Sequence, residues 1–203
     1  MNRNSPLRAL LLTISATLVS GCSSIYLAPK TDFDVKPWKL ATADGDTLSS
    51  ESLKGRAGVV VWVDPTCSDV QDATASDGAL RLLESRWMED SRHVWIVYVA
   101  SRGTKDGSYL DAMMLKAWLK DQKLRGQVVI DDKGKLADQW GVGRVPTASV
   151  VDAAGHVRWS GPAELASDVF DYPDVSGALD SVLQGKPVPL SQKPPSRGCG
   201  LAG

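Results

Sequence analysis

The residue best placed to do chemistry is Cys67, which follows a predicted strand and opens a predicted helix. The run 58–63 reads Gly-Val-Val-Val-Trp-Val, which is typical of a buried central strand. Apolar residues recur every four positions across 67–88 and predict one helix beginning at Cys67. Unpaired backbone N–H groups and the helix dipole at that end favour a thiolate, the nucleophilic form of cysteine. The alternative is a small buried cysteine with no reactivity.

Charge near Cys67 opposes this activation. Three aspartates lie within five residues of the cysteine, and the segment 57–80 contains no Lys or Arg. Neighbouring negative charge disfavours a thiolate. An activating cation must therefore come from elsewhere in the chain, and Arg144, just before a predicted strand, is the candidate. A merely solvated Arg144 is the alternative.

The N-terminus has the pattern of an export signal. Two arginines precede an apolar run over 9–19, and small residues follow it up to Cys22. The run is too short to span a bilayer. Residues 1–21 are therefore predicted to be a signal peptide, either of a lipoprotein or of an ordinary secreted protein.

The stretch Leu-Val-Ser-Gly-Cys over 18–22 resembles the bacterial lipobox. This resemblance implies lipidation of Cys22 and a membrane as a partner through that anchor. Ser23 implies sorting to the outer membrane, facing the periplasm of a bacterial cell envelope. Residues 22–34 are predicted to be a tether, with a short extra edge segment as the alternative.

Lipidation of Cys22 would leave Cys67 and Cys199 as the free thiols of an exported protein. Disulfides persist in such compartments, so the count suggests one pair. A disulfide needs Cα atoms within about 7 Å, which the sequence does not show. Cys199 on a mobile tail that pairs between chains stays open as an alternative.

Composition excludes several classes of function. The 203 residues carry 23 Lys plus Arg against 24 Asp plus Glu, a net charge of −1, which gives no electrostatic footprint for nucleic acid. Two histidines leave little room for a histidine-rich metal site. We therefore expect no nucleic-acid partner, no cofactor and no metal.

The order of predicted elements is a starting hairpin, a β-α-β-α-β run, a second hairpin and a closing helix. This order predicts an α/β fold with a mostly parallel central sheet and helices on both faces. One domain over 35–185 accounts for these elements. Four prolines after 185 predict an extended, Pro-rich C-terminal tail over 186–203.

From about residue 33 to 185 the chain resembles the thioredoxin-like superfamily, in its redoxin branch of peroxiredoxin-related (AhpC/TSA) and TlpA-like domains. The resemblance rests on strand 59–63 running into Pro65-Thr66-Cys67, and on segment 140–147 followed by 150–155. It implies that Pro146 is cis and that its loop, with Arg144, lies against Cys67. Thr66, Arg144 and Pro146 thus join Cys67 and Cys199 as candidate site residues.

The sequence departs from the resembled families at two points. The third residue after Cys67 is Val70, so the Cys-x-x-Cys pair of thioredoxins is absent. Asp64 and Val60 occupy the positions of the peroxiredoxin Thr and Pro, and Thr66 is displaced from them.

These features favour a lipid-anchored thiol redox protein, either a peroxidase or a thiol-disulfide oxidoreductase. Cys67 would attack a peroxide or protein disulfide, Cys199 would resolve the product, and an unknown thiol reductant would restore both. The alternative is a non-catalytic thioredoxin-like binding or assembly module of the envelope. A copper carrier like the Sco proteins would need a Cys-x-x-x-Cys pair, and position 71 is Gln71.

Overall fold

The computed structural model describes residues 30–88, 94–101, 111–163, 174–188 and 198–201. Within these ranges one eight-stranded sheet has the order β1-β9-β8-β4-β5-β6-β2-β3, and a separate two-stranded sheet pairs β10 with β7. The strands are β1 (Phe33–Asp34), β2 (Lys39–Thr42), β3 (Thr47–Ser49), β4 (Ala57–Val63), β5 (Val94–Ser101), β6 (Gln127–Asp131), β7 (Arg144–Val145), β8 (Thr147–Val151), β9 (His156–Pro162) and β10 (Cys199–Gly200). The helices are α1 (Ser50–Leu53), α2 (Ser68–Thr74), α3 (Ala79–Trp87), α4 (Ala112–Asp121), α5 (Lys135–Trp140) and α6 (Val175–Leu183).

The α/β class is confirmed, but the prediction of a mostly parallel sheet is wrong. Only β4, β5 and β6 pair in parallel, through the two β-α-β connections. The other pairs of this sheet are antiparallel: β4 with β8, β8 with β9, β1 with β9, β2 with β3, and β2 with β6. The physical reason is that both hairpins join the same sheet as the parallel strands, and a tight turn reverses strand direction.

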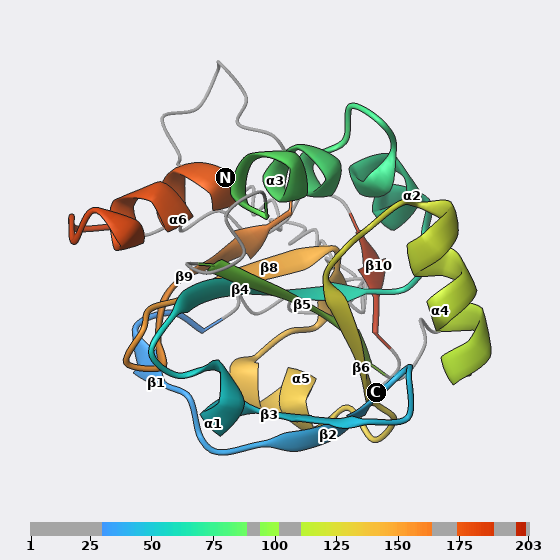
Figure 1. The fold of residues 1–203 in the computed structure, drawn as a ribbon, viewed down its shortest axis with the longest axis horizontal. Helices are drawn as coiled ribbons and strands as arrows, with labels where there is room; N and C mark the ends of the chain where they lie inside the picture. The colour runs from blue at the N-terminus through green and yellow to red at the C-terminus, as the bar shows by residue number, and fades with distance from the viewer. Residues whose placement is uncertain (1–29, 89–93, 102–110, 164–173, 189–197, 202–203) are drawn as a thin grey trace, which may run out of the picture.

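Helices cover both faces of the sheet, as the sequence predicts. Figure 1 shows α3 and α6 over one face and α5 and α1 at the other. The indole N–H of Trp87 in α3 donates to Ser176 of α6 at 3.0 Å, which joins the two upper helices. On the opposite face, Trp140 of α5 packs edge-on against Trp62 of β4, with ring centroids 5.0 Å apart. Every residue of β4 is buried, which explains its uninterrupted apolar sequence.

The single helix predicted over 67–88 is instead two helices, α2 and α3, and this correction concerns the element that carries Cys67. The chain leaves helical geometry at Ala75 and re-enters at Gly78, the N-cap of α3. A Cβ at Gly78 would collide with backbone carbonyls of α2, so the close turn there requires glycine. Ala75 is exposed, so the four-residue repeat that suggested one helix includes a residue outside the core.

A buried carboxylate fixes α3 against the sheet. Glu84 is 2% exposed, and its side chain accepts hydrogen bonds from the Tyr98 hydroxyl of β5 at 2.9 Å and from the backbone N–H of Gly126 at 2.9 Å. The backbone N–H of Arg125 also donates to it, at 2.8 Å. Burial, followed by the charge of Glu84, raises the pKa of Tyr98 well above its usual value. This network holds the helix that follows α2 in one position.

The segment predicted to be a tether contributes to the sheet at its end. Phe33 and Asp34 form β1 and pair with β9, which is the edge segment that the sequence left as an alternative. The His156 imidazole of β9 contacts Asp34 through Nδ1 at 2.9 Å and Asp32 through Nε2 at 3.0 Å. The pKa of His156 is raised by these two hydrogen bonds, that to Asp34 first. The signal peptide, the lipobox and Cys22 lie outside the described residues.

Candidate functional site

The site is centred on Cys67, at the junction between β4 and α2. Cys67 is the N-cap residue of α2, and its backbone N–H donates to the carbonyl of Asp64 at 2.9 Å. The side chain of Cys67 makes no capping hydrogen bond and is 2% exposed. The sequence placed this cysteine at a helix start, and the structure confirms that position although the helix is shorter.

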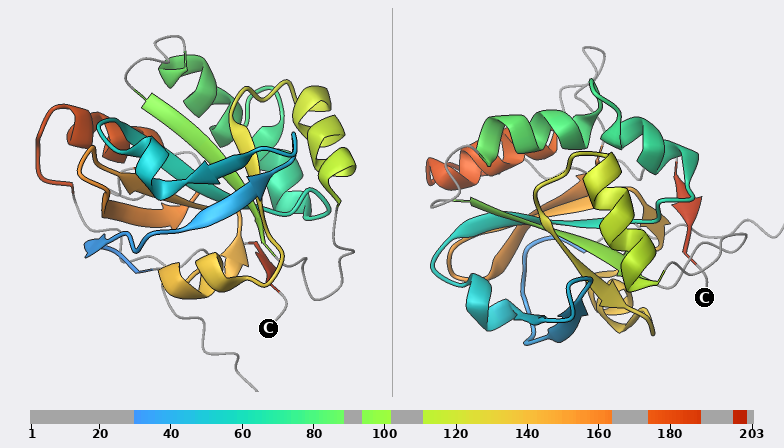
Figure 2. Two further views of the ribbon diagram at one scale, coloured as in Figure 1. Left: turned by 60° about the horizontal axis from the view of Figure 1, so that its bottom comes forward. Right: turned by 45° about the vertical axis from the view of Figure 1, so that its right-hand side comes forward.

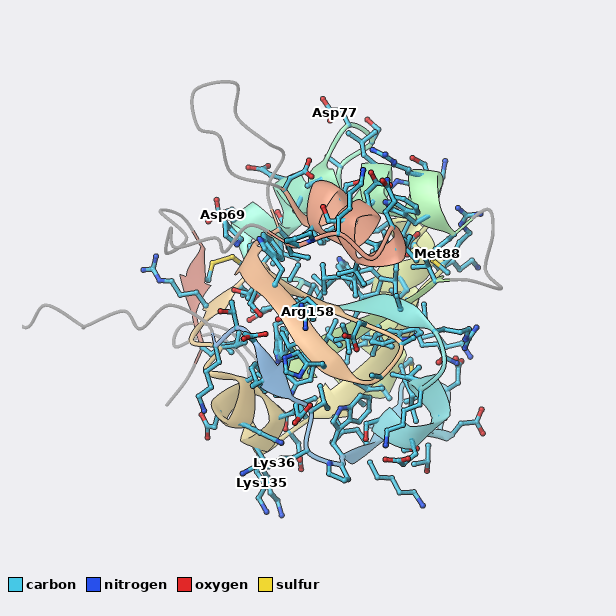
Figure 3. The ribbon with its side chains drawn as sticks, turned by 90° about the vertical axis from the view of Figure 1, so that its left-hand side faces the viewer. Lys36, Asp69, Asp77, Met88, Lys135 and Arg158 are labelled. Atoms are coloured by element: carbon cyan, nitrogen blue, oxygen red, sulfur yellow. A yellow bond between two sulfur atoms is a disulfide. The ribbon has the colours of Figure 1, made fainter. Side chains whose placement is uncertain are left out.

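Cys67 is bonded to Cys199 in a disulfide within one chain. The two Cα atoms are 5.9 Å apart, although the residues are separated by 132 positions. Figure 3 shows the yellow sulfur-sulfur bond near the labelled Asp69. Cys199 is half-buried, so it is the more exposed of the two. The contact that the sequence could not establish is therefore present, and it is intramolecular.

The segment 198–201, which contains Cys199, is held against the domain. Cys199 and Gly200 pair antiparallel with Val145 and Arg144, and the N–H of Leu201 donates to the carbonyl of Gly143 at 3.0 Å. The Leu201 side chain belongs to the hydrophobic core and is 7% exposed. The right-hand view of Figure 2 shows the short strand β10 beside α2.

Gly198 makes the turn that brings the tail into this position. Its φ is +109°, and a Cβ there would lie 2.5 Å from the carbonyl oxygen of Val145. Its N–H donates to Oδ2 of Asp69 at 2.9 Å. Glycine is needed at this point both for the backbone conformation and for the close approach.

The loop opposite Cys67 contains a cis peptide bond between Val145 and Pro146. The carbonyl oxygen of Val145 lies 3.8 Å from the sulfur of Cys67. The cis proline and the position of its loop against Cys67, both implied by the resemblance, are thus observed. Arg144 is half-buried in β7, and its carbonyl accepts from the Thr147 hydroxyl at 2.8 Å.

Two of the flanking aspartates have defined partners. Asp64 is buried, and its Oδ1 accepts from the backbone N–H of Thr66 at 2.8 Å and from the Thr66 hydroxyl at 2.6 Å. The hydroxyl of Thr66 is therefore directed to a carboxylate, and the structure gives it no contact with a sulfur. Asp69 contacts the tail, and one of its oxygens and both sulfurs lie within 4.8 Å of one another.

Asp69 is the site residue whose partner the sequence did not reveal. Its type and nearness to Cys67 were visible, but only as local negative charge. Its hydrogen-bond partner, Gly198, is 129 residues away. No local sequence pattern predicts such a contact. The one available signal was Gly198, directly before Cys199.

A cavity elsewhere in the molecule is distinct from this site. It has a volume of about 210 Å³ and is lined by Trp38, Trp95 and Trp140 together with residues of the 152–155 turn. Neither Cys67 nor Cys199 is part of its lining.

None of the helices in the described residues combines the length and the apolar composition that a membrane span requires.

Solved structures supply the comparison that decides the fold. An uncharacterized conserved protein from Geobacillus kaustophilus matches with a TM-score of 0.68 and 20% identity, over 89% of this chain and 94% of that one. The pneumococcal exposed lipoprotein thioredoxin from Streptococcus pneumoniae strain TIGR4 matches with a TM-score of 0.53 and 22% identity, over 74% of this chain and 97% of that one. A thioredoxin-like superfamily protein matches with a TM-score of 0.59 and 14% identity, over 77% and 99%.

This chain has the thioredoxin-like fold. A scan against protein-family models finds no match, and a search of curated proteins finds no relative. In this fold Cys67 follows β4, a central strand, and is the N-cap of α2, with the cis peptide bond before Pro146 beside it. Its sulfur partner comes from β10, near the end of the chain, instead of from the first turn of the helix.

Proposed function

We propose that this protein is a lipid-anchored thiol-disulfide oxidoreductase of the bacterial cell envelope that uses Cys67 and Cys199. The observation that carries the proposal is the disulfide between a cysteine at a helix N-terminus and one on a short C-terminal strand, in a thioredoxin-like fold. Unpaired N–H groups at the start of α2 stabilise negative charge on Cys67. This effect acts against the negative charge of the neighbouring aspartates, and we assign Cys67, at the helix start, as the nucleophile.

The reaction transfers two electrons from the dithiol to a partner disulfide. The Cys67 thiolate attacks one partner sulfur, a mixed disulfide forms, and the other partner sulfur leaves as a thiolate. The Cys199 thiolate then attacks the Cys67 sulfur, which closes the Cys67–Cys199 disulfide and releases the second partner thiol. A thiol reductant of the envelope, of unknown identity, returns two electrons to the pair.

A protein disulfide fits this site better than a peroxide. Peroxide reduction would convert Cys67 to a sulfenic acid and release water or an alcohol, before Cys199 formed the disulfide with loss of water. The Thr66 hydroxyl donates to Asp64 and gives no support to a bound peroxide. Attack on a disulfide needs no such hydroxyl contact.

Access to Cys67 requires movement of residues 198–201. In the disulfide form Cys67 is buried, and Leu201 anchors the short strand β10. Besides the disulfide, β10 is held by its two residue pairs with β7. The flanking residues Gly198 and Leu201 each donate one backbone hydrogen bond to the domain. We infer that reduction lets these residues separate from β7, so that a partner reaches Cys67.

The envelope location and the anchor on Cys22 rest on the lipobox pattern of 18–22. One structural neighbour, the pneumococcal protein, is an exposed lipoprotein thioredoxin, and a lipid-anchored location for this chain agrees with that. Sorting to the outer membrane rests on Ser23 alone.

A non-catalytic binding or assembly module is the second candidate. The burial of Cys67 under the anchored tail favours it, because a disulfide that never opens would be purely structural. The two candidates differ in whether Cys67 forms a mixed disulfide with a partner.

A trapping experiment tests the proposal. The full-length chain with Cys22→Ser retains Cys67 and Cys199 as its two thiols, and adding Cys199→Ser removes the resolving thiol. This double variant, incubated with a small unfolded protein that contains one disulfide, should accumulate a mixed disulfide on Cys67. The matched Cys22→Ser, Cys67→Ser variant should accumulate far less. Equal trapping by both variants, or none by either, would reject Cys67 as the nucleophile.

A further inference from the structure

We propose that the reduced protein binds one zinc ion between the sulfurs of Cys67 and Cys199 and the carboxylate of Asp69. One ligand atom from each residue lies within 4.8 Å of the other two. Two thiolates and a carboxylate are a donor set that suits Zn²⁺. The inference rests on the proposed function in one respect, since the disulfide must be reducible for the sulfurs to serve as ligands.

The spacing of the three residues fits tetrahedral coordination. With Zn–S bonds of about 2.3 Å and Zn–O bonds of about 2.1 Å, neighbouring ligand atoms lie roughly 3.6–3.8 Å apart. The Cα atoms of the two cysteines are 5.9 Å apart, so side-chain rotation in the reduced form can bring the sulfurs to this separation. Asp69 lies on α2, two residues after Cys67, and one of its carboxylate oxygens is already within 4.8 Å of both sulfurs. Water would fill the fourth position.

The surroundings of the sulfurs favour a cation. Asp69 places a carboxylate close to both sulfurs, and two thiolates beside it would repel one another and the carboxylate. A divalent ion removes that repulsion, because it compensates the charge of both thiolates. The carboxylate that opposes a free thiolate therefore becomes favourable when a metal is bound.

A second contact orients the carboxylate. Oδ2 of Asp69 accepts the N–H of Gly198, directly before Cys199, so one hydrogen bond links two of the three ligating segments. A carboxylate has several acceptor positions and can hold this bond and a metal together. Hydrogen bonds of this kind fix the orientation of metal ligands.

Metal binding and disulfide exchange would exclude each other. When Zn²⁺ replaces the protons of the two thiols, two protons leave and both sulfurs become ligands. Neither sulfur can then attack a disulfide, and oxidation to the Cys67–Cys199 disulfide removes both thiolates and releases the ion. Zinc would thus hold the protein in its reduced form. Residues 67, 69 and 199 form no sequence motif, which is why the sequence predicts no metal site here.

The test is a titration of the reduced full-length Cys22→Ser chain with Zn²⁺ and, separately, with Co²⁺, in metal-free buffer after removal of a phosphine reductant. We expect one ion per chain, release of protons, and a thiolate-to-cobalt charge-transfer band. The oxidised protein should bind neither ion. Failure of the reduced protein to bind one equivalent would overturn the proposal.

Asp69→Asn tests the carboxylate ligand, and Asp72→Asn on the same helix is the matched control, because both remove one negative charge from α2. We expect Asp69→Asn to weaken zinc binding about tenfold or more relative to Asp72→Asn. Equal affinities would overturn the three-residue site. The trapping experiment does not depend on metal, so it separates this failure from failure of the proposed oxidoreductase.

Discussion

Reducing the Cys67–Cys199 disulfide should remove a large part of the free energy of unfolding. The bond joins residues separated by 132 positions, so it constrains most of the unfolded chain. In the chain-entropy description, a loop of this length lowers the entropy of the unfolded state by about 17 cal/mol/K, which is about 5 kcal/mol at 25 °C. Release of β10 and Leu201 in the reduced form, inferred above, would make this difference smaller, because the reduced native state then gains freedom.

Urea unfolding of the full-length Cys22→Ser chain, followed by tryptophan fluorescence, measures this difference. We expect the free energy of unfolding to fall by about 3–5 kcal/mol on reduction, somewhat below the entropic value if the reduced tail gains freedom. The Cys22→Ser, Cys199→Ser variant is the control and should not respond to reductant. A loss below about 1 kcal/mol in the first protein would refute the assignment of an intramolecular, 132-residue loop.

Three further predictions concern Gly198, Glu84 and His156. Gly198→Ala should lower the equilibrium constant for disulfide closure at least tenfold in a glutathione redox buffer, because the new Cβ would meet the carbonyl of Val145. Gly200→Ala is the control: its Cβ would enter open space, so this variant should behave like the parent chain. Glu84→Ala should lower the free energy of unfolding by about 3 kcal/mol or more, because buried donors lose their acceptor, and a loss under about 1 kcal/mol would contradict this. His156 has a raised pKa, so its contribution to stability is complete below pH 6.5 and is lost as pH rises through the folded pKa. The stability difference between the parent chain and His156→Gln should therefore shrink as pH increases, and a difference that does not change with pH would show that its contacts with the two aspartates carry no charge.

Local patterns predicted much of the framework. The apolar run of β4, the helix start at Cys67 and the turn before His156 all follow from neighbouring residues. The sheet topology was less accessible, because a hairpin's direction is set by its turn but its place in the sheet is set by packing. The periodicity of apolar residues did not predict the break between α2 and α3. The break depends on the close approach of Gly78 to backbone carbonyls of α2, which the spacing of residues does not show.

The sequence identified some residues of the site but not the long-range contacts between them. Cys67 was identifiable from its position between a strand and a helix, and the cis bond before Pro146 came from the resemblance. The contact with Cys199 and the role of Asp69 depend on where residues 198–201 lie, after more than a hundred intervening residues. Contacts of that range arise from tertiary packing and are not encoded in local spacing.

The reduction potential of the Cys67–Cys199 pair tests the central claim most directly. The full-length Cys22→Ser chain is equilibrated in thiol-disulfide buffers of graded potential, quenched with acid and alkylated, and the linked and free cysteine peptides are quantified by mass spectrometry. A redox-active pair should have a potential between about −120 and −270 mV, the range of thiol-disulfide oxidoreductases. A potential below about −300 mV would identify a permanent structural disulfide and contradict the proposed function.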